Sequence, residues 1–271
     1  MPRDGLLDVA LRAAEGAAAI IRSRAADAAT IRWRQKRPND FVSEVDTAAE
    51  KAIREVILQD VPDAIVIAEE GSPNASLGDA PTFIVDPLDG TTNFLHGYPA
   101  YAVSIGVLTG RTIVAGVIID VPMHDVYTAM AGDGAFRNGE PIRVSSIAEP
   151  SHALIGTGFP FKNVEQLEIY QRQFAKVTRR TAGIRRPGSA ALDLVSVAGG
   201  RFDGFWELNL MSWDYAAGML LVKEAGGVVT DANGGTPNFG PSSIVAGNPT
   251  MHPWLIQLLA EQPANNSSHD R

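Results

Sequence analysis

The chain has 271 residues, of which 45% are hydrophobic, and it carries a formal net charge of −8 with an isoelectric point near 5.1. This is enough apolar material for one large core or two small ones, and the acidic surface disfavours nucleic acid or an anionic membrane as the main partner. The absence of cysteine excludes disulfides, thiolate metal sites and a cysteine nucleophile.

Residue patterns in the first half predict two helices followed by a strand-rich region. Apolar residues recur at helical spacing over residues 5–24, and residues 31–42 are polar enough for a loop or a frayed hairpin. Thr47-x-x-Glu50 fits a capping box at the start of a second helix. Short β-type runs predict a mainly antiparallel sheet, with strands at residues 64–68, 83–86, 102–108, 112–119, 126–130 and 135–137.

The pattern changes near residue 150, where strands begin to alternate with helices, as is typical of an α/β arrangement. We predict two halves, residues 1–148 and residues 149–262, followed by a polar, disordered tail at 263–271. The strands of the second half are expected at 154–157, 184–186, 202–207, 228–230 and 244–246, and its helices at 164–178, 190–198, 213–225 and 251–260.

The sequence contains no recognisable membrane or secretory segment. No apolar run approaches the ~20 residues that span a bilayer. Charges interrupt the apolar residues near the N-terminus, between Leu6 and Arg12, unlike the apolar core of a signal peptide. We therefore expect a soluble cytoplasmic protein.

The stretch from residue 83 to residue 93 carries the most chemistry. A short apolar strand ends in Asp86, Asp89 follows three residues later, and the chain then turns through Gly90-Thr91-Thr92. Carboxylates at a strand end bind hard cations, whereas the N–H groups and hydroxyls of a Gly-Thr-Thr turn suit a phosphate, above all where a helix begins. The sequence therefore predicts a place where metal ions and a phosphate meet.

Other acids at the ends of predicted elements extend this candidate site. Glu69 and Glu70 follow the strand at 64–68, and Asp214 lies at the start of a helix. Oxygen ligands alone favour Mg²⁺, Mn²⁺ or Ca²⁺ over zinc, and converging carboxylates need cations between them. Since neighbouring strand residues point to opposite faces, only one of the two glutamates is expected to face an ion. Singly, Asp214 could be a helix cap, and the glutamates could be a solvated loop.

Four motifs, taken in chain order, resemble those of the inositol monophosphatase family. They are DFVSEVD at 40–46, AEEG at 68–71, DPLDGTTN at 86–93 with its continuation YAVSIG, and WELNLMSWDYAAG at 206–218. The segment TGFPF at 157–161 also looks like the bacterial branch of the family. The resemblance covers roughly residues 5–260.

This resemblance implies an α+β fold, the layered α/β/α/β/α sandwich of the inositol monophosphatase and fructose-1,6-bisphosphatase type. An antiparallel sheet would dominate the first half and a mixed sheet the second. The active site would lie between the two sheets, because its ligands come from both halves of the chain.

Carried over position by position, the resemblance implies a site for two or three Mg²⁺ ions. Glu69 and Asp86, helped by the backbone carbonyl of Leu88, would bind the first ion. Asp86, Asp89 and Asp214 would bind the second, and a third, weaker ion would involve Glu69 and water. Two such ions can generate hydroxide and stabilise a leaving oxygen.

The resemblance also supplies the catalytic and phosphate-binding roles. Asp46 and Thr91 would orient and deprotonate the attacking water, with Glu69 as a further catalytic residue. Gly90, Thr91 and Thr92 would hold the phosphate. The phosphoryl group would be attacked in line, without a covalent enzyme intermediate.

Substrate recognition would fall to residues of the second half. Glu207 and the Gly188-Ser189-Ala190 segment would face the substrate's hydroxyls, and Arg185 would lie near them. The resemblance implies hydrolysis of a small polyol phosphate, first of all myo-inositol 1-phosphate, by a lithium-sensitive homodimer. Histidinol phosphate, fructose 1,6-bisphosphate and a nucleotide phosphate remain open as alternative substrates.

Two functions outside this class are disfavoured. An aspartyl-phosphate phosphatase needs two acids two residues apart, whereas Asp86 and Asp89 are three apart. Some bacterial members of the family bind RNA or a regulator besides catalysing hydrolysis. The net charge of −8 and the lack of a basic run argue against RNA, so we expect neither a nucleic-acid nor a membrane partner.

Overall fold

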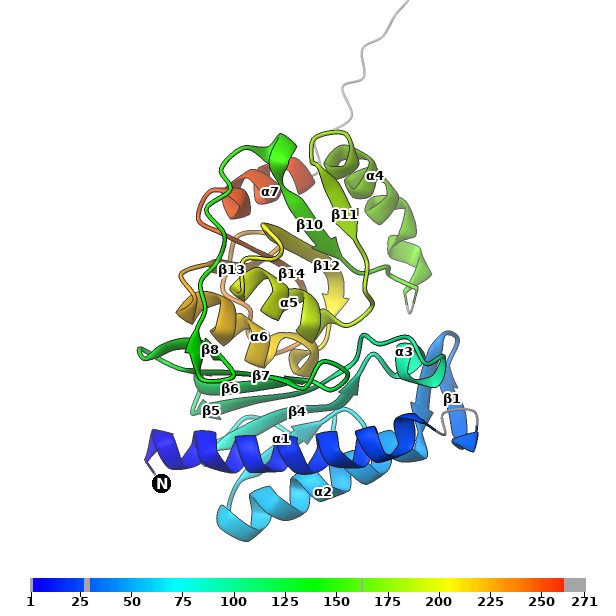
Figure 1. The fold of residues 1–271 in the computed structure, drawn as a ribbon, viewed down its shortest axis with the longest axis vertical. Coiled ribbons are helices and arrows are strands. Elements are labelled where there is room, and N and C mark those ends of the chain that lie inside the picture. Colours follow the sequence, from blue (N-terminus) through cyan, green and yellow to red (C-terminus); the bar gives the residue numbers. More distant parts are fainter. Residues whose placement is uncertain (1, 27–29, 162, 261–271) are drawn as a thin grey trace, which may run out of the picture.

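Helices and strands follow one another along the part of the chain that the structure describes (Figure 1). The computed structural model describes residues 2–26, 30–161 and 163–260, so the predicted disordered tail at 263–271 lies outside the described residues. The helices are α1 (Arg3–Ala25), α2 (Glu44–Asp60), α3 (Thr91–Leu95), α4 (Leu167–Thr178), α5 (Ala190–Ala198), α6 (Ser212–Glu224) and α7 (Met251–Leu259), with 3₁₀ turns η2 (Pro150–His152) and η3 (Val164–Gln166). The strands are β1 (Trp33–Arg37), β2 (Asp40–Ser43), β3 (Ile65–Ala68), β4 (Thr82–Asp89), β5 (Ala102–Thr109), β6 (Thr112–Asp120), β7 (Asp125–Met130), β8 (Gly134–Arg137), β9 (Glu140–Pro141), β10 (Leu154–Thr157), β11 (Gly183–Arg185), β12 (Gly204–Leu210), β13 (Val228–Asp231) and β14 (Ser242–Gly247).

The elements stack in layers of alternating helix and sheet (Figure 1). Helices α1 and α2 cover one face of a seven-stranded sheet of order β3-β4-β5-β6-β7-β8-β9, in which only β3 and β4 pair in parallel. Helices α5 and α6 separate this sheet from a five-stranded one of order β11-β10-β12-β14-β13, and α4 and α7 close the far side. The second sheet is mixed, because β10 pairs in parallel with β11 and β12 whereas β14 pairs antiparallel with its neighbours. The predicted α+β sandwich is confirmed.

Helix α2 begins earlier than the sequence pattern predicts. Its N-cap is Ser43, whose hydroxyl accepts the N–H of Asp46 while the Asp46 carboxylate accepts the N–H of Ser43 at 2.9 Å. The predicted capping box at Thr47 and Glu50 is therefore wrong. Strand β2 runs directly into the helix, so the first turn is already complete at Thr47, and Glu50 instead accepts the N–H of Glu70 at 2.8 Å.

Helix α6 lies unusually close to the seven-stranded sheet, and this closeness sets the position of its N-terminus. A Cβ atom added at Gly106 on β5 would come within 2.9 Å of the Ala216 side chain, and one at Gly116 on β6 within 3.0 Å of the Ala217 carbonyl oxygen. The Ser104 hydroxyl also donates to the carbonyl of Trp213 at 3.3 Å. Small residues at the contact thus let the first turn of α6 rest against β5.

The largest apolar core joins the two predicted halves of the chain. It contains Ile84 and Tyr127 from the first half as well as Leu194 and Phe205 from the second, all nearly inaccessible to solvent. The predicted boundary after residue 148 falls between β9 and η2. The division into two domains stays a prediction, and the shared core ties the two halves together.

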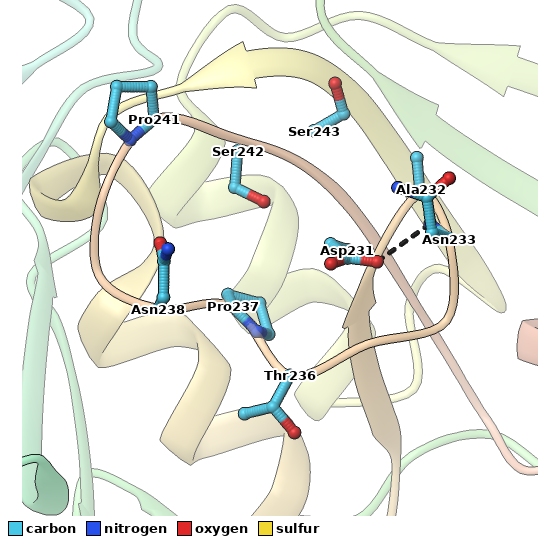
Figure 2. Close-up of a pocket in the computed structure, with 9 residues that line it drawn as sticks. All are labelled: Asp231, Ala232, Asn233, Thr236, Pro237, Asn238, Pro241, Ser242 and Ser243. Carbon is cyan, nitrogen blue, oxygen red and sulfur yellow. Dashed lines mark hydrogen bonds between the residues drawn. The ribbon is translucent and has the colours of Figure 1, made fainter.

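The loop between β13 and β14 encloses a cavity of about 330 Å³ (Figure 2). Its walls are Asp231, Ala232, Asn233, Thr236, Pro237, Asn238, Pro241, Ser242 and Ser243. The Asp231 carboxylate accepts the N–H groups of Asn233 at 2.8 Å and Gly235 at 2.9 Å, so it fixes the turn that follows β13. No residue of the predicted site lines this cavity.

Candidate active site

The two acids of the signature share one side of β4 because the strand is irregular between them. Asp86 pairs with Ser104 and Asp89 with Ala102, so three steps along β4 match two steps along β5. In a regular strand, residues three apart point to opposite faces, and one extra residue restores the shared side. The bulge at Pro87 and Leu88 therefore turns a spacing of three into a pair of neighbouring carboxylates.

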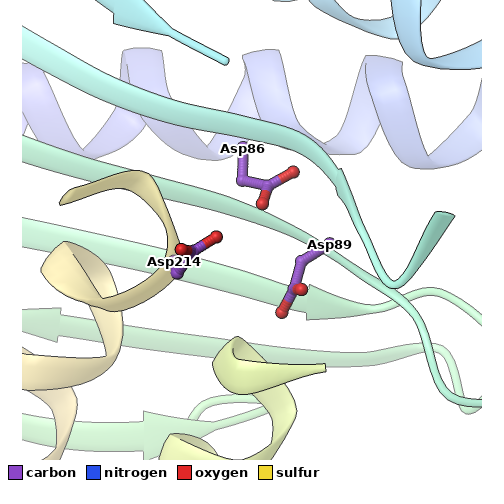
Figure 3. A group of neighbouring side chains, drawn as sticks. All are labelled: Asp86, Asp89 and Asp214. Atoms are coloured by element: carbon purple, nitrogen blue, oxygen red, sulfur yellow. The ribbon is translucent and has the colours of Figure 1, made fainter. Parts of the chain in front are cut away.

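Asp214 completes a cluster with these two acids (Figure 3). It is the third residue of α6, and its carboxylate accepts the N–H of Met211 at 2.7 Å, closing a capping box. One carboxylate oxygen each from Asp86, Asp89 and Asp214 lies within 4.8 Å of the others. The structure thus brings together three of the predicted metal ligands from two elements far apart in sequence.

Electrostatics favours a cation at this cluster. Burial raises the pKa of Asp86 well above its usual value, and the charges of Glu69, Asp89 and Asp214 raise it further. Such crowding disfavours ionisation unless a positive charge lies among the carboxylates. The donor set consists of oxygens, so the residues present fit Mg²⁺ or a similar hard cation.

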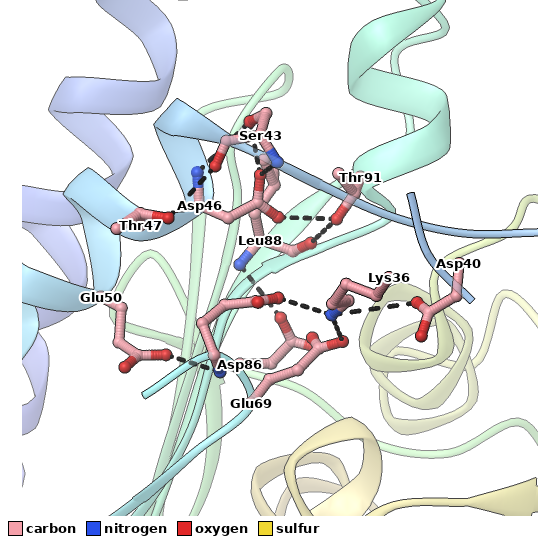
Figure 4. Close-up of polar contacts among 11 residues, drawn as sticks. Lys36, Asp40, Ser43, Asp46, Thr47, Glu50, Glu69, Asp86, Leu88 and Thr91 are labelled. Atoms are coloured by element: carbon pink, nitrogen blue, oxygen red, sulfur yellow. Dashed lines mark hydrogen bonds and ion pairs between the residues drawn. The ribbon is translucent and has the colours of Figure 1, made fainter. Parts of the chain in front are cut away.

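Glu69 and Glu70 both bind the ammonium group of Lys36. Figure 4 shows Lys36 with Glu69 and Asp40. The Lys36 Nζ lies 2.8 Å from Glu69 and 2.7 Å from Glu70, with Asp40 at 3.9 Å. Strand β3 ends at Ala68, so the two glutamates lie in a turn, and the strand alternation used to separate them does not apply.

The ion pairs raise the pKa of Lys36 and lower that of Glu70, whereas burial acts on each group in the opposite direction. Burial lowers the pKa of Lys36, but the charges and hydrogen bonds of Glu69 and Glu70 more than offset it, so the pKa is raised. Burial raises the pKa of Glu70 to about 7 against the hydrogen bond from Lys36. Lys36 therefore remains an ammonium ion beside Glu69 and Glu70.

Asp46 and Thr91 meet beside Leu88 (Figure 4). The Thr91 hydroxyl lies 2.7 Å from Asp46 Oδ1 and 3.1 Å from the carbonyl oxygen of Leu88, and its single proton can go to one of them at a time. Burial raises the pKa of Asp46, although hydrogen bonds from Ser43 and Thr91 oppose this. The Leu88 N–H in turn donates to Asp86 at 3.0 Å. The predicted water-activating pair and the predicted carbonyl ligand are thus in contact.

The turn after Asp89 has the geometry that the sequence suggests for an anion. Helix α3 begins at Thr91, with Gly90 as its N-cap at φ 97°. A Cβ at Gly90 would lie 2.7 Å from the Ala100 carbonyl oxygen, so both the backbone angle and the space require glycine. The first N–H groups of α3, including those of Thr91 and Thr92, have no partner within the helix and can face a phosphate.

The N-terminus of α5 is anchored on the same cluster. Asp89 Oδ2 accepts the Ser189 hydroxyl at 2.6 Å and the Ala191 N–H at 2.7 Å. Asn93 donates to the carbonyls of Pro187 at 2.9 Å and Gly188 at 3.3 Å. The predicted substrate segment at residues 188–190 is therefore held against the carboxylate cluster and α3.

Glu207 and Arg185, the other predicted substrate residues, differ in burial and in their contacts. Glu207 is half-buried on β12, and its carboxylate fills the space over Gly158, where an added Cβ would lie 2.0 Å from it. Arg185 is exposed at the end of β11, and its guanidinium donates to the carbonyl of its neighbour Ile184 at 3.0 Å. The guanidinium of Arg186 lies instead over the rings of Phe159 and Phe161, 4.9 and 5.1 Å from their centroids.

Sequence reasoning assigns no role to Lys36, Asn93 or Arg186. Asn93 is the last residue of the DPLDGTTN motif, and its place in this motif is the sequence feature that could have marked it as functional. Arg186 adjoins the predicted Arg185, and the sequence does not reveal which arginine turns inward. Lys36 meets its partners across more than thirty residues of chain, so no local pattern marks it.

The chain is similar to known proteins over nearly its whole length. The model of the inositol monophosphatase family matches residues 3–264. The chain is 42% identical over 258 residues to the Nus factor SuhB of Pseudomonas aeruginosa, covering 94% of this chain and 95% of that one. It is 42% identical over 259 residues to the inositol-1-monophosphatase of Rhizobium meliloti, covering 96% and 97%. The crystal structure of extragenic suppressor protein suhB from Bartonella henselae superimposes with a TM-score of 0.90 at 40% identity, covering 96% and 100%.

The layered sandwich, with an oxygen-only carboxylate cluster between its sheets, is that of a class of phosphatases acting on small phosphorylated substrates. The chain belongs to the inositol monophosphatase family and is a phosphatase of that family. None of the helices in the described ranges has the length and apolar character needed to cross a membrane.

Proposed function

We propose that this phosphatase is a Mg²⁺-dependent phosphomonoesterase that hydrolyses a small polyol phosphate, with myo-inositol 1-phosphate as the first candidate. The observation that carries the proposal is the convergence of Asp86, Asp89 and Asp214 beside the N-terminus of α3. Carboxylates and unpaired N–H groups at one point suit a phosphate ester bound through cations.

The metal ions would be held by Asp86, Asp89 and Asp214, and by Glu69 with the Leu88 carbonyl. Bound there, they would supply a water of lowered pKa and stabilise charge on the leaving oxygen. We propose two or three ions per site. The close approach of Lys36 to Glu69 means that the ammonium group must give way, or be tolerated nearby, when Glu69 takes a cation.

Asp46 and Thr91 provide a path for the proton of the attacking water. When the Thr91 hydroxyl donates to Asp46 Oδ1, its oxygen is free to accept a hydrogen bond from a water molecule. A proton lost by that water can pass to Thr91 as Thr91 transfers its own to Asp46. The raised pKa of Asp46 supports this role, because it makes the carboxylate a better base.

The phosphate would be held by the N–H groups of Gly90, Thr91 and Thr92, and the leaving alcohol would face Glu207 and Ser189. Carboxylates only accept hydrogen bonds, so Glu207 suits a leaving group that carries hydroxyls or an ammonium group. This is why inositol phosphate and histidinol phosphate both fit the proposal.

A panel of phosphate esters tests the proposed function. Phosphate release would be measured with Mg²⁺ for inositol 1-phosphate, histidinol phosphate, fructose 1,6-bisphosphate and a nucleoside monophosphate. The proposal expects the highest kcat/KM for the inositol ester. Fast release from another ester, with none from inositol 1-phosphate, would rule out inositol 1-phosphate as the substrate and identify the ester that replaces it.

We further propose a cytoplasmic homodimer that Li⁺ inhibits, as the family resemblance implies. Sedimentation velocity at micromolar concentration would give the oligomeric state. Titration of LiCl at a fixed Mg²⁺ concentration would give the inhibition. A monomer, or activity unchanged by Li⁺, would contradict the corresponding part.

The names of some relatives favour a second candidate function, a binding role of the kind that the name Nus factor denotes. The Pseudomonas aeruginosa relative is named a Nus factor at 42% identity. The net charge of −8 argues against direct contact with RNA, so a protein partner is the form that we would test. If an Asp86→Asn variant restored the cellular function of a deletion strain, binding rather than hydrolysis would be the function that the cell requires.

A further inference from the structure

Asp193 is a buried carboxyl group that the proposed mechanism does not use. It lies in the first turn of α5, and its residue is 1% exposed. Neither of its carboxylate oxygens has a hydrogen-bond partner within the part of the chain that the structure describes. Because buried polar groups are nearly always hydrogen-bonded, an unpartnered carboxyl calls for a water or a functional explanation.

The surroundings of Asp193 connect it to the leaving-group side of the site. Phe205 and Glu207 alternate along β12 and so share one face of the strand. Phe205 packs in the same apolar core as Leu192 and Leu194, the neighbours of Asp193 on α5. That face of β12 is therefore the one covered by α5. Glu207 is also the neighbouring charge that acts most strongly on Asp193.

Glycine at position 158 creates the space in which Glu207 sits. The Glu207 carboxylate occupies the position of the missing side chain, 2.0 Å from where a Cβ would be. Strand β10 pairs with β12 in parallel, with Thr157 opposite Trp206, so Gly158 just past the end of β10 lies beside Glu207 in the middle of β12. Helix α5 covers this face of β12 and carries Asp193 in its first turn, so a group on α5 can influence where the Glu207 carboxylate points.

The protonation of Asp193 suits it to be a hydrogen-bond donor. Burial raises its pKa well above the usual value, the charges of Glu207 and Asp89 raise it further, and Arg186 opposes them. A carboxyl that keeps its proton can donate one hydrogen bond and accept others. One enclosed water could then satisfy it while donating to a neighbouring carboxylate.

We propose that Asp193 is a specificity-determining positioning residue, which holds the Glu207 carboxylate toward the leaving group through an enclosed water. The inference rests on the proposed function, because Glu207 discriminates between substrates only if it faces the leaving alcohol. The inference narrows the substrate class to phosphate esters whose leaving group carries hydroxyls and no second phosphate. The Glu207 carboxylate, held in this way, accepts hydrogen bonds from a polyol and repels a second phosphate.

Two substitutions test the inference by comparing esters. Asp193→Leu fills the site without hydrogen-bonding groups, whereas Asp193→Asn keeps both shape and a donor. The readout is the ratio of kcat/KM for inositol 1-phosphate, or for the best polyol ester of the panel, to kcat/KM for p-nitrophenyl phosphate. That aryl ester offers no leaving-group hydroxyl to Glu207.

We expect Asp193→Leu to lower this ratio roughly tenfold, mainly through KM, which is the typical effect of one hydrogen bond to a charged group. Asp193→Asn should keep the ratio within about threefold of the wild type. In a Glu207→Gln background, Asp193→Leu should change the ratio no further, because the two residues act through one contact. If the leucine variant does not fold, Asp193→Ala carries the same expectation.

Different failures have different meanings. A purely structural role would lower kcat/KM for both esters in parallel and leave the ratio unchanged, which would overturn the inference. An asparagine variant as impaired as the leucine variant would also overturn it, because it would mean that a negative charge is needed. If the wild-type enzyme released phosphate from no polyol ester, the proposed function would fail first.

Discussion

Asp86 is the residue on which the proposed metal site depends most. It is buried and belongs to both proposed ion-binding sets, and the charges of its acidic neighbours act on it directly. Asp86→Asn keeps the shape of the side chain and removes one charge. We expect kcat/KM to fall at least about 100-fold with every ester, since several kcal/mol of charge stabilisation is lost. Phosphate release at saturating Mg²⁺ measures this.

The same variant should be more stable than the wild type when no divalent ion is bound. Asparagine removes one carboxylate from a crowded, buried cluster and so relieves repulsion. Thermal unfolding in EDTA would show a higher midpoint for Asp86→Asn. A lower midpoint together with intact activity would exclude Asp86 from the metal site.

Lys36 competes with a metal ion for Glu69. Its ammonium group occupies one carboxylate oxygen of Glu69 and adds a positive charge near the cluster. We expect Lys36→Gln to lower the half-saturating Mg²⁺ concentration about two- to fivefold at low ionic strength, the effect of removing roughly 1 kcal/mol of repulsion. Arg32→Gln, which removes an equal charge from an exposed pair with Glu44, is the control. Weaker Mg²⁺ binding in Lys36→Gln would mean that Lys36 orients Glu69 for the ion.

At the scale of elements, the contact between α6 and β5 positions Asp214. Gly106→Ala would place a Cβ against Ala216 and push the helix away from the sheet. We expect a loss of roughly 1–3 kcal/mol in the free energy of unfolding, typical of overpacking, and a drop in kcat/KM as Asp214 shifts. Urea denaturation and phosphate release measure the two effects.

Gly16→Ala is the matched control for this prediction. Gly16 lies on the exposed side of α1, and an added Cβ meets no atom within 4 Å. The same change of residue should there stabilise the protein by about 0.5–1 kcal/mol, because alanine favours the helix. Two glycine variants with shifts of the same sign and size would contradict the steric argument.

Most elements could be predicted from residue periodicity, whereas the irregular positions could not. The strand at 154–157 and the helix at 190–198 coincide with β10 and α5, because their apolar patterns are continuous. The bulge between Asp86 and Asp89 leaves no mark in a pattern of single residues, yet it decides that both acids face one side. The start of α2 was misplaced because two capping boxes compete over a few residues, and β2 selects the earlier one.

At the scale of the whole molecule, the site depends on contacts between distant segments. Motif resemblance indicated Asp214 and Glu207 as partners of the signature, although more than a hundred residues separate them from it. It could not indicate Lys36, which reaches Glu69 from the β1–β2 hairpin, or Asp193, whose lack of partners is visible only in three dimensions. The family motifs thus indicated the residues of the proposed reaction, whereas Lys36 and Asp193, which act on those residues, could be found only from the fold.

Several buried acids make stability depend on both pH and metal. Burial and neighbouring charges raise the pKa values of Asp46, Asp86 and Asp193, and burial raises that of Glu70 to about 7. A carboxyl whose pKa is higher in the folded than in the unfolded state contributes stability below its unfolded value, about 4. That contribution is lost as the pH rises through the folded value. Lys36 stays charged over this range, so it does not offset the loss.

The metal-free protein should therefore become less stable between about pH 5 and about pH 8. We expect its unfolding midpoint in EDTA to fall by at least about 4 °C over this range, the equivalent of one or two kcal/mol for a chain of this size. Mg²⁺ should remove most of the difference, because a bound cation favours the ionised carboxylates and stabilises the folded state by mass action. Calorimetry at several pH values, with and without Mg²⁺, measures both slopes. A midpoint that rose with pH in EDTA, or a slope that Mg²⁺ left unchanged, would show that the cluster is not where the protein binds its ions.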